Sequence, residues 1–276
     1  MTQRHPIGVF DSGVGGLSVL RHLRTQLPAE QFIYLADQGH VPYGSRSATE
    51  IIQFSQGMTH FFLQLNVKAI VIACNTASAA ALSLLREQFE LPFVGMEPAV
   101  KPAAEQTKSG KVGILATGGT FASDRYARLT AKYAQGISVQ EDPCVGLVPE
   151  IEAGRLDSPK VHHILQRALA PMLAAGVDTV VLGCTHYPFV LPMVAEIAGT
   201  AVSIIDPSPA VARQTGVVLR RDNLLADTTQ SGSVRFVTSG NASSLARQVE
   251  QLLGWNGVVV ETAVWAKEQL SLIGYP

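Results

Sequence analysis

The sequence is poor in charge and has no long apolar run. Charged residues make up 16% of the 276 residues, the formal net charge is −1, and no cluster of Lys or Arg occurs along the chain. This charge distribution lacks the electrostatic footprint of a nucleic-acid-binding protein, so we expect no nucleic-acid partner. No stretch approaches the ~18 consecutive apolar residues of a membrane span. We therefore expect no membrane association either.

Cysteine is also scarce. The chain has three cysteines, an odd number that does not suit a disulfide framework. Its first residues, MTQRHPIGVF, include neither the apolar stretch nor the cleavage site of a secretory signal. Both observations favour the cytoplasm, a reducing compartment in which each cysteine is a free thiol unless it binds a metal ion.

Apolar residues, in contrast, are abundant. They make up 47% of the chain, with a mean hydropathy of +0.21, which suffices for a full core and excludes intrinsic disorder. Short apolar runs alternate with segments of helical spacing, such as 47–65 and 158–176. Uninterrupted apolar runs are typical of parallel strands covered on both faces, so the alternation predicts an α/β fold with mostly parallel sheets. The predicted strands are 7–10, 31–36, 69–74, 92–95, 111–117, 178–184 and 201–206.

A weak internal repeat underlies this alternation. IGVFDSGVGG resembles VGILATGGT, AIVIACNTASAAAL resembles TVVLGCTHYPFVL with Cys74 aligned to Cys184, and EPAVKPA resembles DPSPAVA. The three pairs keep the same order at nearly one spacing of about a hundred residues, which indicates two related α/β units. We divide the chain into a first domain (1–97), a second domain (98–206), and a segment (207–276) that returns to complete the first domain.

The two aligned cysteines each end a predicted strand. In open parallel sheets ligands bind beyond the carboxyl ends of the strands, so two similar units that face each other would bring Cys74 and Cys184 together across one cleft. A single strand-end cysteine is more often a small buried hydrophobic residue, but its duplication favours function. A thiol can act as acid or base near neutral pH. Two thiols on opposite faces of a carbon atom can therefore remove a proton from one side and supply one to the other, which inverts a stereocentre.

Other chemistries are less well supported. Cys74, Cys184 and His186 could ligate zinc, but no Cys-x-x-Cys or His-x-x-x-His pair accompanies them, so we predict no metal. The glycine-rich stretch FDSGVGG lacks the spacing of a nucleotide-binding loop. Asp11 within it would repel phosphate; it suits a substrate ammonium group or a neighbouring donor, or it caps the following helix. Cys144 has no partner in the repeat and is interpreted as structural.

Several stretches together resemble the glutamate racemases of the aspartate/glutamate racemase superfamily. The stretches are FDSGVGGLSVL, VPYGSRS, ACNTASA, GILATGGTFASDRY, VPEIEAG and LGCTHYP, and the resemblance covers about Ile7 to Pro209. It implies two similar domains related by a pseudo-twofold axis, with the active site between them. It also implies interconversion of L- and D-glutamate without a cofactor, which supplies D-glutamate for peptidoglycan synthesis.

The resemblance also implies roles for individual residues. Cys74 would exchange the proton of the D-isomer and Cys184 that of the L-isomer, with Asp11, His186 and Glu152 assisting. The implied substrate contacts are Asp11, Ser12, Pro42, Tyr43, Gly44, Asn75, Thr76, Thr117, Thr120, Thr185 and His186. The stretch Gln38-Gly39-His40 departs from the pattern common among relatives, which affects the expected structure of that loop but not the chemistry.

Three alternatives remain at this stage. An aspartate racemase on the same scaffold would usually carry Glu at the position of His186. A decarboxylase or isomerase would need only one thiol, and a two-lobed binding protein would need none. The expected partners are a small-molecule substrate and a second copy of this chain. The homodimer is suggested by apolar helical segments such as HFFLQL at 60–65.

Overall fold

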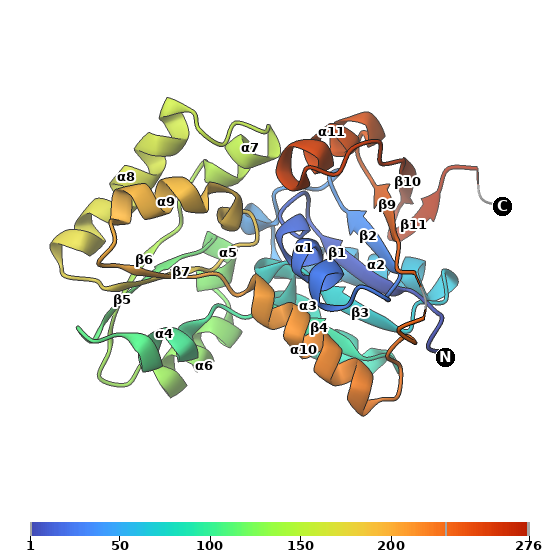
Figure 1. Cartoon of the computed structure of the whole chain (residues 1–276), viewed down its shortest axis with the longest axis horizontal. Coiled ribbons are helices and arrows are strands. Elements are labelled where there is room, and N and C mark those ends of the chain that lie inside the picture. The colour runs from blue at the N-terminus through green and yellow to red at the C-terminus, as the bar shows by residue number, and fades with distance from the viewer. Residues whose placement is uncertain (1, 230, 275–276) are drawn as a thin grey trace.

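The computed structural model describes residues 2–229 and 231–274, which form two lobes, each built around its own sheet (Figure 1). One sheet contains β1 (Ile7–Asp11), β2 (Phe32–Ala36), β3 (Ala69–Ile72), β4 (Phe93–Gly95), β9 (Val234–Thr238), β10 (Val260–Ala266) and β11 (Gln269–Leu272). The other contains β5 (Lys111–Leu115), β6 (Ser138–Asp142), β7 (Thr179–Leu182) and β8 (Ser203–Ile205). All neighbouring strands run parallel except the antiparallel pair β10–β11, which confirms the predicted α/β class.

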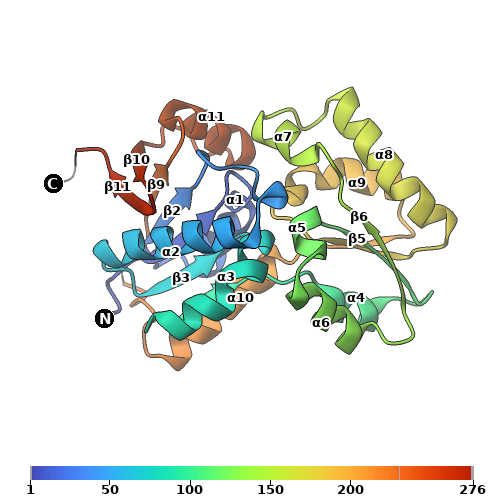
Figure 2. The same cartoon turned by 180° about the vertical axis from the view of Figure 1, so that it is seen from behind.

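Helices cover both sheets. In chain order they are α1 (Leu17–Gln26), η1 (Tyr43–Ser45), α2 (Ala48–Gln64), α3 (Asn75–Gln88), α4 (Val100–Gln106), α5 (Gly118–Phe121), α6 (Asp124–Tyr133), α7 (Leu147–Glu152), α8 (Pro159–Ala174), η2 (Tyr187–Val190), α9 (Leu191–Ala198), α10 (Ser208–Arg221) and α11 (Ala242–Leu253), where η marks a 3-10 helix. The seven-stranded sheet has α1, α10 and α11 on one face and α2 and α3 on the other (Figures 1 and 2).

The central strands are apolar throughout because helices cover both of their faces. Val9 packs into the core that α1 and α10 share, whereas its neighbour Phe10 points to the opposite face and contacts the ring of Phe62 on α2. Successive side chains of a strand point to opposite faces, so only a strand buried on both sides is uniformly apolar. This arrangement explains the runs from which the strands were predicted.

The two sheets share a common plan. The order β2-β1-β3-β4 in the first sheet corresponds to β6-β5-β7-β8 in the second, in agreement with the internal repeat. The first sheet is longer because β9, β10 and β11 add to it beside β2. Strand β6 escapes prediction because it lies at the edge of its sheet, where its sequence Ser-Val-Gln-Glu-Asp is polar and partly exposed.

The segment HFFLQL, which suggested a homodimer, turns its two phenylalanines inward. Phe61 and Phe62 are buried in the core between α2 and the sheet, whereas Leu63 is exposed. The phenylalanines therefore stabilise this chain and offer no surface to a second copy, and the homodimer stays a prediction.

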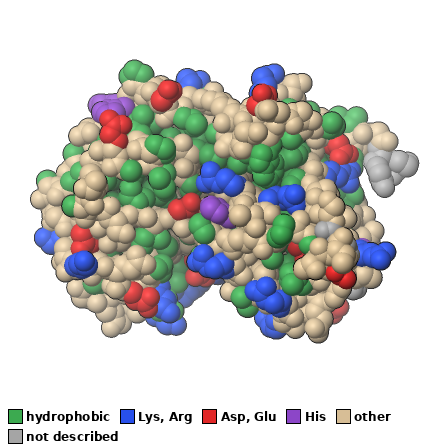
Figure 3. All heavy atoms as spheres, in the orientation of Figure 1, with side chains coloured by type: hydrophobic (Ala, Val, Ile, Leu, Met, Phe, Trp, Pro, Cys, Tyr) green, Lys and Arg blue, Asp and Glu red, His purple; other side chains and the backbone are tan. Residues whose placement is uncertain are grey.

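On the face of the molecule drawn in Figure 3, acidic and basic side chains are interspersed. Among the described helices, none is long and apolar enough to cross a bilayer.

Candidate active site

A cavity of about 440 Å³ lies between the two lobes. Residues that directly follow strands of both sheets line it: Ser12 follows β1, Cys74 lies beyond β3, Thr117 beyond β5, and Cys184 beyond β7. The carboxyl ends of the strands in both sheets therefore meet at one site, as expected for ligand binding by parallel sheets.

Most of the predicted site residues form the wall of this cavity. They are Ser12, Pro42, Tyr43, Gly44, Cys74, Asn75, Thr76, Thr117, Cys184, Thr185 and His186. Asp11, Thr120 and Glu152 lie outside this wall. Each of them is hydrogen-bonded to a residue that lines it, namely Thr185, Thr117 and His186, respectively.

Cys74 lies at the start of α3 with little exposure. It is the N-cap residue of that helix, and its Sγ accepts a hydrogen bond from the backbone N–H of Ala77 at 3.4 Å. The side chain is 5% exposed, and burial, together with the charge of Asp11, raises the pKa of the thiol well above its usual value. Because the hydrogen bond from Ala77 opposes this shift only in part, Cys74 rests as the protonated thiol.

Cys184 has a different environment, because an imidazole lies beside it. Its Sγ is 3.7 Å from Nδ1 of His186, and Nε2 of His186 is 2.6 Å from Oε1 of Glu152. Burial alone would lower the pKa of His186, but the interactions with Cys184 and Glu152 outweigh it and raise that pKa well above its usual value. Burial acts against ionisation of Glu152 as well, yet the hydrogen bonds from His186 and Val14 lower the pKa of this carboxyl. His186 is therefore a buried imidazolium whose Nδ1 faces the sulfur of Cys184.

The glycine-rich loop after β1 allows side chains of the other lobe to approach its backbone closely. A Cβ atom on Gly13 would lie 1.9 Å from Oε1 of Glu152, and one on Gly15 would lie 2.5 Å from Nδ1 of His186. The backbone N–H of Val14 donates to Oε1 of Glu152 at 2.8 Å. The glycines of this loop therefore allow the two lobes to pack closely against each other.

Asp11 joins the lobes at the same place. Its carboxylate is fully buried, with Oδ1 accepting from the N–H of Gly13 at 2.8 Å and Oδ2 accepting from the hydroxyl of Thr185 at 3.1 Å. Burial raises its pKa, while the positive charge of His186 acts in the opposite direction. The helix-cap interpretation of Asp11 is wrong, because α1 begins at Leu17 and its N-cap position is Gly16.

Polar groups on the wall are available to a ligand. The hydroxyl of Thr76, at the start of α3, is 2.9 Å from that of Thr117, which precedes α5 in the other lobe, and Thr120 supports both. The side-chain oxygen of Asn75 is buried and has no hydrogen-bond partner in the described structure. Buried acceptors are nearly always satisfied, so this oxygen is available to a donor group of a ligand or to water.

One part of the wall escaped prediction. The loop between β6 and α7 contributes Pro143, Cys144, Val145 and Gly146, although the sequence predicts a structural role for Cys144. Cys144 is buried with a φ of 44°, and burial raises its pKa. The available signal was the position of this loop directly before VPEIEAG, one of the recognised motifs.

Comparison with known proteins agrees with this geometry. The family model described as Asp/Glu/Hydantoin racemase matches residues 7–215. A glutamate racemase of Herpetosiphon aurantiacus is 50% identical over 242 residues, which cover 88% of this chain and 95% of that protein.

Solved structures are similar as well. The crystal structure of a glutamate racemase isoform from Bacillus anthracis is 34% identical, with a TM-score of 0.87 over 97% of this chain and 99% of the other. The Escherichia coli glutamate racemase in complex with L-glutamate and an activator is 31% identical, with a TM-score of 0.81 over 98% of this chain and 100% of the other. The chain therefore belongs to the Asp/Glu/Hydantoin racemase family.

Proposed function

We propose that this protein interconverts L-glutamate and D-glutamate, with Cys74 and Cys184 as the two groups that exchange the α-proton. The observation that carries the proposal is that two thiols, from equivalent positions of two related units, line the same cavity. Glutamate is the substrate of the similar proteins from Herpetosiphon aurantiacus and Bacillus anthracis by their names. No observation favours aspartate over glutamate.

The surroundings of the two thiols suit one direction of the reaction. The thiolate of Cys184 removes the α-proton of L-glutamate, and the thiol of Cys74 donates its proton to the opposite face of the same carbon. D-glutamate forms, Cys184 becomes the thiol, and Cys74 becomes the thiolate; reaction of D-glutamate reverses each transfer. The positive charge of His186 beside Cys184 would stabilise the negative charge of this base. The raised pKa of Cys74 keeps a proton on its sulfur, ready for transfer to the substrate.

The remaining wall residues stabilise the charge that develops on the substrate. The backbone N–H groups in the first turn of α3 have no carbonyl partner within the helix and suit a carboxylate, although that of Ala77 donates to Cys74. The free oxygen of Asn75 suits the substrate ammonium group. Hydrogen bonds aimed at the carbanion in a cavity shielded from water replace the electron sink of a cofactor.

The deciding experiment is incubation with L-glutamate in deuterated water without added cofactor. Circular dichroism follows the loss of optical activity, and mass spectrometry follows the α-hydrogen. We expect deuterium to enter the α-position as optical activity is lost, and its incorporation to continue in the racemic mixture until both isomers are deuterated. L-aspartate in a parallel reaction tests the rival substrate, and intact protein that exchanges neither amino acid would disprove racemisation.

Two further proposals concern the setting of this activity. We propose a cytoplasmic location, because all three cysteines are free thiols and D-glutamate is consumed in peptidoglycan synthesis. We also propose that the chain divides into a first domain (1–97), a second domain (98–206) and a segment (207–276) that returns to the first domain. The addition of β9, β10 and β11 to the first sheet supports this division.

A further inference from the structure

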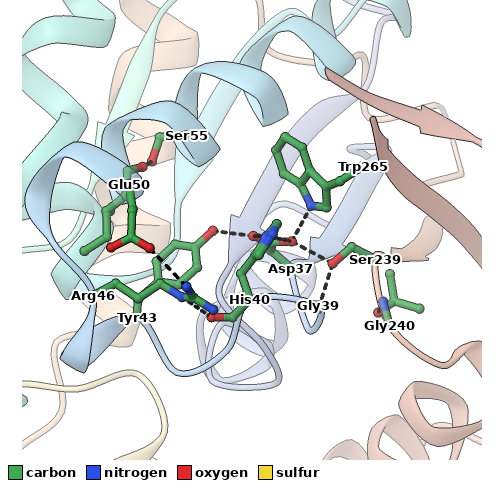
Figure 4. Close-up of polar contacts among 12 residues, drawn as sticks. Asp37, Gly39, His40, Tyr43, Arg46, Glu50, Ser55, Ser239, Gly240 and Trp265 are labelled. Carbon is green, nitrogen blue, oxygen red and sulfur yellow. Dashed lines mark hydrogen bonds and ion pairs between the residues drawn. The ribbon is translucent and has the colours of Figure 1, made fainter. Parts of the chain in front are cut away.

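The carboxylate of Asp37, directly beyond β2, accepts hydrogen bonds from four side chains. The Tyr43 hydroxyl donates to Oδ2 at 2.6 Å, and Nδ1 of His40 is 3.0 Å from the same oxygen. The Ser239 hydroxyl donates to Oδ1 at 2.6 Å and the Trp265 indole N–H at 2.7 Å. Figure 4 shows Tyr43 reaching Asp37 from one side and Trp265 and Ser239 from the other.

This carboxylate is saturated with donors. Asp37 is fully buried, and although burial acts against ionisation, the hydrogen bonds from His40, Ser239 and Tyr43 lower its pKa. A carboxylate offers about four lone-pair sites, so four donors leave none unused. The position of each donor is therefore coupled to the other three through one charged group.

One of these donors forms part of the cavity wall. Tyr43 begins η1, a single 3-10 turn of three residues that presents Pro42, Tyr43 and Gly44 to the cavity. So short a helix is not stable alone, so its position depends on outside contacts. Gly44 also lies against the other lobe, where a Cβ atom on it would be 2.9 Å from Cβ of Thr117. Movement of Tyr43 would therefore move the wall relative to Thr117.

Another donor comes from the C-terminal segment. Trp265 lies on β10, with its ring centroid 5.3 Å from that of His40 and 5.8 Å from that of Phe54. Gly57 on α2 leaves room for the indole, since a Cβ atom there would lie 2.5 Å from the Trp265 ring. The indole is held on several sides and can fix the carboxylate.

We propose that Asp37 is a positioning residue that links Trp265 on β10 to the Tyr43–Gly44 wall and thereby sets the affinity for glutamate. Neither Asp37 nor Trp265 lines the cavity, so both act through Tyr43. The inference rests on the proposed glutamate racemase activity and extends it to the C-terminal segment, which lies outside the recognised motifs.

The test compares W265F and D37N with W255F, all in the full-length protein. W265F keeps an aromatic ring but removes the indole N–H donor. D37N replaces one of the two acceptor oxygens by an N–H₂ group, so that two of the four donors face another donor instead of an acceptor. Trp255 is the other tryptophan of the chain and packs on Phe236, away from Asp37, so W255F is a matched control. We expect W265F to raise KM for both enantiomers roughly three- to tenfold and D37N at least tenfold, with kcat changed by no more than about twofold. W255F leaves KM unchanged.

Thermal unfolding and calorimetric titration with L-glutamate accompany the kinetics. A purely structural role lowers the unfolding temperature and the amount of active protein, so kcat falls at constant KM, and that result overturns the inference. Unchanged KM in both W265F and D37N overturns it as well. Wild-type protein that binds glutamate without racemising it instead contradicts the proposed function, and the Kd values of the same variants then decide the inference. Absence of glutamate binding to the wild-type protein overturns both.

Discussion

His186 and Glu152 form a buried pair in which imidazole Nε2 and carboxylate Oε1 lie 2.6 Å apart, with the thiol of Cys184 on the far side of the ring. The carboxylate fixes which ring nitrogen faces the thiol, and the charges of the pair stabilise each other. Both residues come from the second lobe, whereas the N–H of Val14 reaches the same carboxylate from the first. The protonation of the site is thus tied to the contact between lobes.

The E152Q variant tests this pair. Because Glu152 raises the pKa of His186, its replacement lowers that pKa towards the ordinary value. Activity that needs the imidazolium is lost as pH rises through the pKa of His186, so the alkaline limit of kcat for L-glutamate moves to lower pH. The measurement is the pH profile of initial rates. E150Q, on the same helix but paired with Arg155 and Lys160, is the control and leaves the alkaline limit in place.

The same pair contributes to stability in a defined pH window. The raised pKa of His186 stabilises the fold fully below the unfolded value of about 6.5. This contribution is lost as pH rises through the folded pKa. The lowered pKa of Glu152 has the opposite sign: its contribution is present above the unfolded pKa and is lost as pH falls through the folded one. Urea unfolding of wild type and E152Q should therefore differ most near neutral pH, and an equal difference at all pH values would contradict the assignment.

Replacing either thiol separates the two half-reactions. We expect C74S and C184S to lose racemisation by at least about a hundredfold, because each lacks one proton carrier. C74S retains Cys184 and should still exchange the α-hydrogen of L-glutamate with deuterium, whereas C184S should exchange that of D-glutamate. Mass spectrometry of each resolved enantiomer gives the answer. The reverse pattern would exchange the roles of the two cysteines.

The thiols should also differ towards alkylation. Burial raises the pKa values of Cys74 and Cys144, whereas Sγ of Cys184 lies 3.7 Å from Nδ1 of the His186 imidazolium, and thiols beside a cationic histidine are the reactive ones in proteins. At neutral pH, iodoacetamide should therefore modify Cys184 first, and glutamate should protect it. Peptide mass spectrometry over time measures the order, and faster modification of Cys144 would contradict the electrostatic description.

Gly13 tests the fit between the lobes. The G13A substitution places a methyl group on Oε1 of Glu152, so the carboxylate must move and we expect kcat to fall at least tenfold, in line with the roughly hundredfold cost of a 1 Å misplacement. G216A on α10 is the matched control, since Gly216 is also buried, has a Leu27 side-chain carbon 3.2 Å from the added Cβ, and does not line the cavity. Full activity in G13A would mean that Glu152 is not required where it lies.

Much of the fold could be predicted because its central strands are buried on both faces and therefore uniformly apolar. Cys74 and Cys184 were found because the repeat aligns them, and the shared strand order of the sheets explains that alignment. Strand β6 and the Cys144 loop were missed, since a partly exposed edge strand and an irregular loop carry no periodic signal. The bond between Asp37 and Trp265 joins residues far apart in the sequence, and only the three-dimensional arrangement of β2 and β10 brings them together.

The near-complete enclosure of the two thiols, which are 5% and 6% exposed, has a kinetic consequence. Separation of the lobes would widen the way to these thiols, and it breaks the bonds from Val14 to Glu152, from Thr185 to Asp11 and between Thr76 and Thr117. At about 1 kcal/mol each, these bonds oppose opening by roughly 3 kcal/mol. We therefore expect the departure of product to be slower than proton transfer, so that turnover would decrease as solvent viscosity increases.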